Sequence, residues 1–262
     1  MIGITGGNGV VGKLIAKELK KKEINFNIYK GDIRDYEDLC NWLKINKISS
    51  IIHLAAKVAI KDVKNNPVEA IEVNVNGMIQ LLKAITNSEE TIYLFYASTS
   101  HVYKSSDKPI NENHEIDPIS FYGKTKRLAE EVLIDTKSEL ANSKLNYCIG
   151  RIFSFYHDNQ NPPYLYPTLK NRFKEEDLSK PFKLFGAKSI RDFLNADEVA
   201  TIIIKIVEKK LQGVYNIGSG KGQKIIDFVT NMAPQKLDFL IDENEKTDYL
   251  VADISKLNND LN

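Results

Sequence analysis

The sequence has few of the features that mark secreted, membrane-spanning or nucleic-acid-binding chains. Its only two cysteines, Cys40 and Cys148, lie far apart in apolar or amphipathic runs, and we expect buried thiols in a reducing compartment. No run of about 18 apolar residues is present, and the chain opens on a strand pattern where a cleavable leader would begin. The formal net charge of +1 gives no reason to expect nucleic acid or a membrane as a partner. We therefore expect a cytoplasmic protein.

Internal repeats and low-complexity segments are also lacking, and the chain alternates apolar strands with amphipathic helices instead. Strands are expected at 2–4, 26–30, 50–56, 91–97 and 145–155, and helices at 10–22, 36–46, 67–86 and 122–138. This alternation predicts an α/β fold with a Rossmann-like, doubly wound parallel sheet.

The periodicity weakens between about residues 154 and 190, where four prolines occur. We expect a dinucleotide-binding domain formed by residues 1–153 plus about 192–218. A small C-terminal substrate-binding lobe is expected from about 154–191 plus 219–262.

A glycine-rich turn, Thr5-Gly6-Gly7-Asn8-Gly9-Val10-Val11-Gly12, separates the first expected strand from the first helix. Gly6, Gly9 and Gly12 let the backbone approach a pyrophosphate, whose charge is stabilised at the helix N-terminus. A plain glycine-rich turn is the alternative interpretation. The position directly after the first strand favours dinucleotide binding.

The second strand ends in Tyr29-Lys30, where an acidic residue would bind the ribose 2′-hydroxyl of NAD. A lysine suits a 2′-phosphate better, so the expected cofactor is NAD(P), with NADP(H) slightly favoured. The alternative is a solvated surface lysine. Two residues further on, Asp32 could accept a hydrogen bond from the adenine amino group.

Tyr122 and Lys126 are spaced four residues apart in an expected helix and so share one helix face. A nearby ammonium favours phenolate and lowers the pKa of a tyrosine, which suits proton transfer near neutrality. The same spacing also arises by chance on exposed helices. Its place after the glycine-rich turn and a hydroxyl-rich segment favours a catalytic pair.

The hydroxyl-rich segment is Ala97-Ser98-Thr99-Ser100-His101-Val102-Tyr103, at the end of an expected strand. Ligands of open α/β sheets bind beyond the carboxyl ends of the strands. Thr99 could therefore hydrogen-bond a reacting sugar oxygen, although a polar turn after a buried strand is an equal alternative. His101 could act as an acid or a base, but a solvent-facing loop histidine is the favoured interpretation.

With these motifs the chain resembles the NAD-dependent epimerase/dehydratase family, the extended short-chain dehydrogenases that act on nucleotide sugars. The resemblance spans nearly the whole length. It also rests on the segments His53-Leu54-Ala55-Ala56, at the family's fourth strand, Asn74-Val75-Asn76-Gly77, Arg191-Asp192-Phe193, Tyr215-Asn216-Ile217-Gly218-Ser219-Gly220 and Ala252-Asp253-Ile254-Ser255-Lys256.

The resemblance implies roles for individual residues. Tyr122 would be the acid or base, assisted by Thr99, while Lys126 would bind the nicotinamide ribose. Arg191 would hold the sugar-nucleotide pyrophosphate, unless it only forms a surface ion pair with Asp192 or Asp197. The implied cofactor contacts are Gly6, Gly9, Val10, Val11, Gly12, Lys30, Asp32, Ile33, Leu54, Ala55, Ala56, Lys57, Asn74, Tyr122 and Lys126, and the implied substrate contacts are Thr99, Ser100, Ser154 and Arg191. No metal site is expected.

Departures from the family pattern narrow the reaction. Dehydratases of the family carry Thr-Asp-Glu where this chain has Thr99-Ser100-His101, so we expect no 4,6-dehydratase activity. In the segment that resembles the family's Arg-x-x-Asn-x-Tyr-Gly, Ser154 replaces the asparagine and His157 the glycine. The region of the second and third strands is compressed compared with typical epimerases of the family. In this it is more like the deoxysugar 4-ketoreductases.

These observations favour an NAD(P)-dependent oxidoreductase that reduces a 4-keto-6-deoxy sugar nucleotide. One alternative is a nucleotide-sugar 4-epimerase with tightly bound NAD. A noncatalytic nucleotide-binding or assembly protein on the same fold is another, disfavoured by the retention of Thr99, Tyr122 and Lys126. The resemblance further implies a homodimer formed through residues 77–86 and 124–138.

Overall fold

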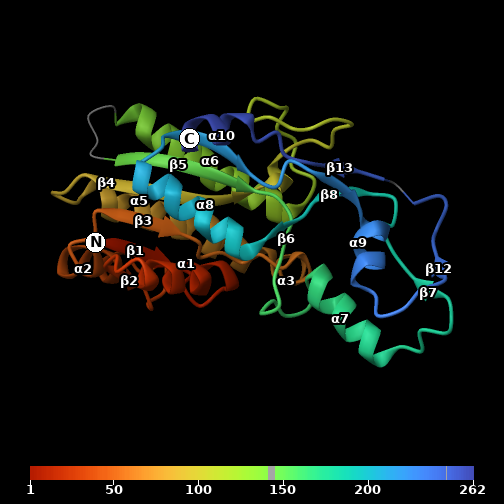
Figure 1. The fold of residues 1–262 in the computed structure, drawn as a ribbon. Helices are drawn as coiled ribbons and strands as arrows, with labels where there is room; N and C mark the ends of the chain where they lie inside the picture. Colours follow the sequence, from red (N-terminus) through yellow and green to blue (C-terminus); the bar gives the residue numbers. More distant parts are fainter. Residues whose placement is uncertain (141–144, 246) are drawn as a thin grey trace.

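The computed structural model describes residues 1–140, 145–245 and 247–262, without the side chains of residues 60 and 61. A parallel six-stranded sheet, in the order β10-β5-β4-β3-β1-β2, forms the centre of the molecule (Figure 1). Its strands are β1 (Ile2–Thr5), β2 (Phe26–Ile28), β3 (Ser50–His53), β4 (Ile92–Thr99), β5 (Leu145–Ile152) and β10 (Gly213–Ile217). The doubly wound α/β prediction is confirmed.

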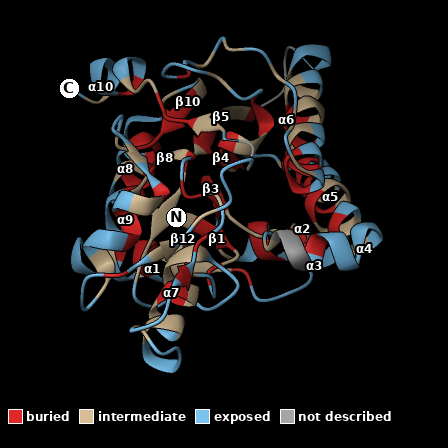
Figure 2. Ribbon diagram, turned by 90° about the vertical axis from the view of Figure 1, so that its right-hand side faces the viewer, coloured by how far each residue is buried: buried red, intermediate tan, exposed pale blue. Residues whose placement is uncertain are grey.

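Helices cover both faces of this sheet (Figures 1 and 2). One face packs against α1 (Val10–Lys21) and α8 (Ala196–Lys209), and the other against α2 (Tyr36–Ile45), α5 (Gly77–Thr86) and α6 (Phe121–Glu139). Burial of the sheet between two helical layers explains why its strands are almost continuously apolar.

Strand β4 shows how the sequence divides between the two cores. Tyr93 and Phe95 point into the α1/α8 side, whereas Ile92, Leu94 and Tyr96 point into the α2/α5/α6 side. Successive side chains of a strand alternate between the faces, so each face receives its own hydrophobic set.

A smaller set of elements lies beyond the carboxyl ends of the strands and has a hydrophobic cluster of its own, which includes Phe182, Ile225 and Val229 (Figure 1). These elements are α7 (Leu165–Glu175), β7 (Phe182–Lys183), β8 (Ile190–Asp192), β11 (Gly222–Lys224), α9 (Ile225–Met232), β12 (Phe239–Leu240) and β13 (Tyr249–Leu250). The expected division between the domain and the lobe stays a prediction. One part of the expected lobe, α10 (Ser255–Leu261), packs against the main sheet instead, since Leu257 joins the α1/α8 core.

Several expected elements differ in detail. The expected helix at 67–86 is built from α4 (Pro67–Ile71), the π-helical turn η1 (Glu72–Asn76) and α5. The expected strand at 145–155 ends at Ile152, and β6 (Phe155–Tyr156) then pairs with β9 (Leu194–Asn195). Helix α3 (Ile60–Asn65) and the 3-10 turn η2 (Ser100–Val102) were not expected.

Two further details differ from expectation, namely the strand that His53 ends and the burial of one of the two cysteines. His53 ends β3, the third strand of the chain, and not a fourth strand as the family resemblance implied. Of the two cysteines, Cys148 is a buried free thiol, whereas Cys40 is only half-buried.

Candidate active site

The glycine-rich turn joins β1 to the N-terminus of α1. Gly6 has a φ of 71°, and a Cβ placed there would lie 2.6 Å from the backbone nitrogen of Ala55. A Cβ on Gly12 would lie 2.7 Å from the carbonyl oxygen of Gly6. Both positions therefore require glycine.

The first turn of α1 is open to a ligand. Gly9 is the N-cap, no side chain caps the helix, and a Cβ on Gly9 would approach only the Gly6 carbonyl, at 3.4 Å. The backbone N–H groups of Val10, Val11 and Gly12 are free of intrahelical partners and suit an anion. This geometry fits the diphosphate of a dinucleotide.

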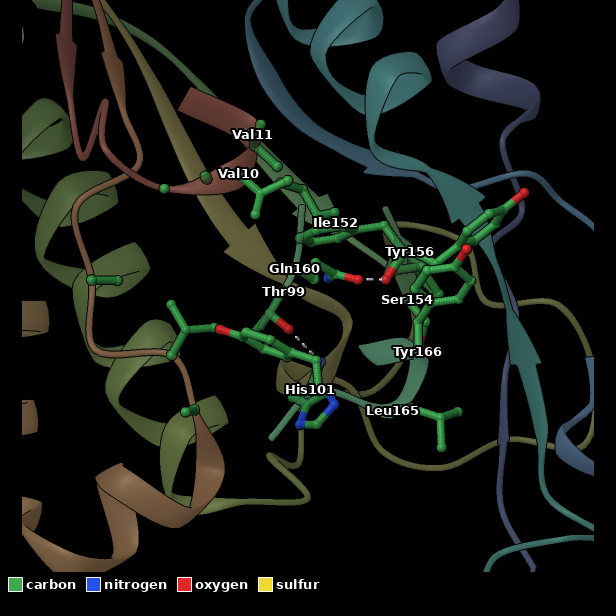
Figure 3. Close-up of a pocket in the computed structure, with 18 of the residues that line it drawn as sticks. Val10, Val11, Thr99, His101, Ile152, Ser154, Tyr156, Gln160, Leu165 and Tyr166 are labelled. Atoms are coloured by element: carbon green, nitrogen blue, oxygen red, sulfur yellow. Dashed lines mark hydrogen bonds between the residues drawn. The ribbon is translucent and has the colours of Figure 1, made fainter. Parts of the chain in front are cut away.

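A cavity of about 650 Å³ begins at this turn and extends to the second lobe. Figure 3 shows Val10 and Val11 on one side of it and Tyr156 and Tyr166 on the other. Of the predicted site residues, those that line the cavity are Gly6, Gly9, Val10, Val11, Gly12, Leu54, Ala56, Thr99, Tyr122, Lys126, Ser154 and Arg191. The structure thus brings the three expected catalytic residues to one cavity, together with part of the expected cofactor and substrate residues.

Tyr122 lies in the first turn of α6, which Ser120 caps by accepting a hydrogen bond from the Gly123 N–H at 3.0 Å. Burial raises the pKa of Tyr122 above its usual value, and the neighbouring Tyr164 raises it further. A hydrogen bond with Thr99 acts in the opposite direction. Tyr122 is therefore a protonated phenol at neutral pH.

Lys126 does not produce the expected lowering of the Tyr122 pKa. Its ammonium lies 4.2 Å from the ring centroid of Tyr96, and the side chain is almost fully buried. Burial lowers the pKa of Lys126 to about 7, against the opposing effect of the Glu130 carboxylate. The helical spacing was predicted correctly, but desolvation outweighs the charge effect that the spacing alone suggests.

The remaining cofactor-side residues lie behind the cavity wall. Asn74, in η1, accepts a hydrogen bond from the Lys57 N–H at 2.7 Å and donates to the Lys57 carbonyl at 3.0 Å. It also donates to Thr125 Oγ1 at 2.9 Å, which ties this loop to α6. The Ala55 N–H donates to Thr5 Oγ1 at 3.3 Å. These residues hold the backbone that carries Leu54 and Ala56.

The loop after β2 lies outside the cavity lining. Lys30 is exposed, whereas Ile33 is buried against Gly77. The Asp32 carboxylate accepts hydrogen bonds from the Arg34 backbone N–H and Nε, both at 2.9 Å, and this pairing lowers the pKa of Asp32 to about 2. Arg34, which the sequence analysis did not single out, follows Lys30 by four residues in the same loop and forms ion pairs with Asp32 and Glu69.

On the substrate side, Arg191 forms a two-pronged ion pair with Asp248, at 2.7 and 2.8 Å. The alternative partners are excluded, because Asp192 accepts from Ser219 and backbone N–H groups, and Asp197 faces His157. Ser100 is buried and does not line the cavity.

His101 lines the cavity, which contradicts the favoured interpretation of a solvent-facing histidine (Figure 3). Its backbone N–H donates to Thr99 Oγ1 at 3.3 Å, and its ring lies 6.0 Å from that of Tyr122. The η2 turn packs the segment against α6 and leaves His101 only partly exposed.

Sequence reasoning missed the aromatic wall of the second lobe. Phe193 and Phe228 stack at 4.0 Å, and Tyr156 and Tyr166 pack against Phe228 at 5.6 and 6.5 Å. These rings and Tyr164 line the cavity. They come from segments far apart in the chain, so no local spacing could have identified them.

No helix among the described residues is both long and apolar enough to cross a bilayer. The same residues contain no group of three or more His, Cys, Asp or Glu side chains arranged to hold a metal ion.

Curated relatives include 4-epimerases, a dTDP-D-glucose 4,6-dehydratase and a 4-dehydrogenase. The chain is 31% identical over 236 residues to a UDP-glucuronate 4-epimerase from Thermodesulfobacterium geofontis, covering 89% of this chain and 69% of that one. It is 24% identical over 231 residues to a GDP-6-deoxy-D-talose 4-dehydrogenase from Aggregatibacter actinomycetemcomitans, covering 85% and 75%.

Among solved structures, a UDP-glucose-4-epimerase from Stenotrophomonas maltophila with bound NAD and formylated UDP-arabinopyranose superposes with a TM-score of 0.87. The match covers 99% of this chain and 91% of that one at 19% identity, which supports the fold.

Fold, cavity and relatives together define an enzyme class, the extended short-chain dehydrogenases that act on nucleotide sugars with NAD. Residues 7–260 match the family described as GDP-mannose 4,6 dehydratase, and the chain belongs to this family within the NAD-dependent epimerase/dehydratases.

Proposed function

We propose that the protein is an NAD(P)-dependent oxidoreductase that reduces a 4-keto-6-deoxy sugar nucleotide. This proposal rests on one observation. Thr99, Tyr122 and Lys126 line the same cavity as the glycine-rich turn. The lack of acidic side chains at positions 99–101 argues against dehydration.

NAD(P)H would supply the hydride to C4 of the sugar. Tyr122 donates its proton to the C4 oxygen as negative charge develops there, and the raised pKa keeps this donor protonated before the reaction. Thr99 positions the same oxygen through its hydroxyl group. Lys126, which lines the cavity one helical turn after Tyr122, binds the hydroxyls of the nicotinamide ribose.

The cofactor preference proposed is NADP(H). Lys30 is exposed after β2, and Arg34 lies in the same loop. Two basic side chains at the adenosine end of the glycine-rich turn favour the additional charge of a 2′-phosphate. At the other end of the cavity, Arg191 would contact the pyrophosphate of the sugar nucleotide, and the aromatic wall would enclose the base and sugar.

We also propose a homodimer through α5 and α6. These helices pack against each other and leave Ile79 39% and Leu128 45% exposed. Exposed apolar side chains on two adjacent helices are what the helices of a partner would cover.

A 4-epimerase is the second candidate, supported by the relative at 31% identity. The same residues would serve it, but Tyr122 would have to lose its proton before it could accept one, because its raised pKa keeps it protonated at neutral pH. The two functions differ in their use of cofactor, because an epimerase regenerates NAD in each cycle and consumes none.

The deciding experiment follows NADPH and NADH oxidation at 340 nm with the 4-keto-6-deoxyglucose derivatives of UDP and dTDP and the 4-keto-6-deoxymannose derivative of GDP. Steady oxidation that is lost in Tyr122→Phe supports the reductase. Conversion of UDP-glucose or UDP-glucuronate to its C4 epimer without added cofactor identifies the epimerase instead. Absence of both reactions would overturn the proposal.

A further inference from the structure

Lys126 has a buried ammonium group whose described contacts include no carboxylate. The residue is 2% exposed, and the described part of the chain gives its ammonium neither a hydrogen bond nor an ion pair. Glu130 lies one helical turn further along α6, but Arg151, Arg127 and Ser98 already bind its carboxylate. A buried charge without a partner is costly, so another group must stabilise this ammonium.

The ring of Tyr96 provides that contact. Helix α6 packs against β4 (Figure 2), and the Lys126 ammonium lies 4.2 Å from the centroid of the Tyr96 ring. The Tyr96 hydroxyl also donates to the Lys126 backbone carbonyl, at 3.5 Å. The negative face of an aromatic ring attracts a cation, and the attraction is strongest where both groups are desolvated, as they are here.

His53 and the end of β1 support the Tyr96 ring. His53 is the neighbour of Tyr96 in the parallel register of β3 and β4, and the two rings stack with planes 23° apart. Thr5 Oγ1 accepts from the Ala55 N–H and lies 2.6 Å from His53 Nδ1, so the Thr5 hydroxyl donates to Nδ1. Burial and the nearby Lys126 lower the pKa of His53 to about 3. The imidazole is therefore neutral at pH 7 and does not repel the ammonium.

A ring face suits this ammonium better than a carboxylate would. An ammonium has three N–H donors, and a carboxylate would accept hydrogen bonds from them in competition with the hydroxyls of a ligand. The ring face stabilises the positive charge from one side and leaves the donors on the other side free. Because Lys126 lines the cavity, these donors can bind a ligand there.

We propose that Tyr96 is a positioning residue, whose ring face holds the Lys126 ammonium ready for the hydroxyls of the nicotinamide ribose and thereby sets the affinity for the cofactor. Tyr96 acts through Lys126, since it is fully buried and does not line the cavity itself. The inference rests on the proposed function, because it takes NAD(P) as the ligand of Lys126.

The test varies the electron density of the ring and keeps its shape nearly constant. Tyr96 is replaced by phenylalanine and then by phenylalanine with one, two or three ring fluorines, each of which weakens the attraction of the ring face for a cation. Calorimetry at pH 6, below the pKa of Lys126 of about 7, measures the Kd of NADP⁺ and NAD⁺. We expect Tyr96→Phe to bind like the wild type and Kd to rise with each fluorine, by about 10-fold or more in total.

An NMR titration of ¹³C-labelled lysine side chains gives a second readout, in which Lys126→Met identifies the Lys126 signal. The titratable groups around this ammonium are His53 on β3, Tyr96 on β4 and Glu130 on α6, with Tyr122 one helical turn before it. Only the ring at position 96 changes in the series. The pKa of Lys126 should therefore fall with each fluorine, because the cation loses stabilisation.

Tyr93 provides the matched control, since it lies on the same strand and points into the opposite core. The same fluorine series at Tyr93 should leave both the cofactor Kd and the Lys126 pKa unchanged. Equal responses at the two positions would show that Tyr96 has only a structural role and would refute the inference.

NADPH oxidation by the wild type, with the three sugar nucleotides named above, separates the two proposals. Oxidation together with a constant Kd or a constant Lys126 pKa along the Tyr96 series overturns the role of Tyr96 and leaves the reductase standing. A graded Kd without oxidation supports Tyr96 and overturns the reductase. A wild type that binds neither NADP⁺ nor NAD⁺ overturns both.

Discussion

The carboxylate of Glu130, on the helix that carries Tyr122 and Lys126, accepts hydrogen bonds from Nε and Nη2 of Arg151 at 3.0 and 2.8 Å. The Glu130 side chain is fully buried and that of Arg151 is 4% exposed. Ser98 Oγ also donates to this carboxylate, at 2.5 Å. The pair therefore joins α6 to β4 and β5 directly behind the catalytic residues.

Replacement of Arg151 by methionine should destabilise the fold strongly, because it leaves the buried Glu130 carboxylate with too few donors. We expect a loss of about 3 kcal/mol in the free energy of unfolding, which is the lower end of the range for a broken buried ion pair. The loss is at the lower end because Arg127 still contacts the Glu130 carboxylate at 3.1 Å. Urea denaturation followed by circular dichroism measures it. Arg34→Met, which removes the surface pairs with Asp32 and Glu69, is the matched control and should shift the midpoint less. Equal shifts would contradict the structural role of the buried pair.

Replacement of Tyr122 by phenylalanine should lower kcat by about 10²–10⁴-fold, because the reaction loses its proton donor. The melting temperature should change little, since the ring stays in place. Tyr147→Phe is the matched control: Tyr147 lies on β5 outside the cavity lining, so turnover should be unaffected. Unchanged turnover in Tyr122→Phe would rule out the catalytic assignment.

Local patterns predicted the parts of this site that depend on neighbours in the sequence. The glycine-rich turn and the helical spacing of Tyr122 and Lys126 follow from backbone geometry, so the sequence was sufficient for them. The pKa of Tyr122 was not predictable in the same way. Its direction depends on how deeply the phenol is buried, which tertiary packing decides.

Contacts between segments far apart in the sequence could not be predicted from local sequence patterns. Arg191 pairs with Asp248, 57 residues away, and η2 packs the segment of His101 against α6. The aromatic wall combines Tyr156, Phe193 and Phe228 from segments far apart in the chain. Such pairings follow from topology, and a single sequence does not determine which of the many possible partners will meet.

Replacement of Lys30 by glutamate should reverse the proposed preference for NADPH, because a carboxylate repels a 2′-phosphate and accepts hydrogen bonds from a ribose diol. We expect KM for NADPH to rise about 10-fold or more, the equivalent of one lost charge-assisted hydrogen bond, and KM for NADH to fall. Initial rates at varied cofactor concentration measure it. Lys44→Glu, an exposed lysine on α2, should leave both values unchanged. A parallel rise for both cofactors would contradict the assignment.

Replacement of Leu128 by arginine should convert the proposed dimer to monomers, because it places a charge in an apolar helix contact. Light scattering coupled to size-exclusion chromatography gives the mass directly. Ile45→Arg changes an equally apolar residue, 77% exposed at the end of α2, and should leave the mass unchanged. A wild-type mass of one chain would refute the dimer, and a Leu128→Arg dimer would refute the interface.

The buried Lys126 should make the stability depend on pH in a defined window. Its pKa is lowered to about 7 in the folded protein, whereas an unfolded lysine titrates near 10.5. Between these values the unfolded chain binds more protons than the folded one. The free energy of unfolding therefore rises with pH from about 7, by at most about 1.4 kcal/mol per unit for one proton.

Lys126→Met should remove this contribution, so the difference between wild type and variant isolates it. The comparison is needed because burial raises the pKa of Cys148 to about 12, and that thiol makes stability fall as pH rises above its unfolded value near 9. Urea titrations at pH 7, 8 and 9 measure both proteins, with Lys124→Met, on the exposed side of the same helix, as the control. If the wild-type slope matched that of Lys126→Met, the ammonium would be solvated in solution, and its place on the Tyr96 ring would be wrong.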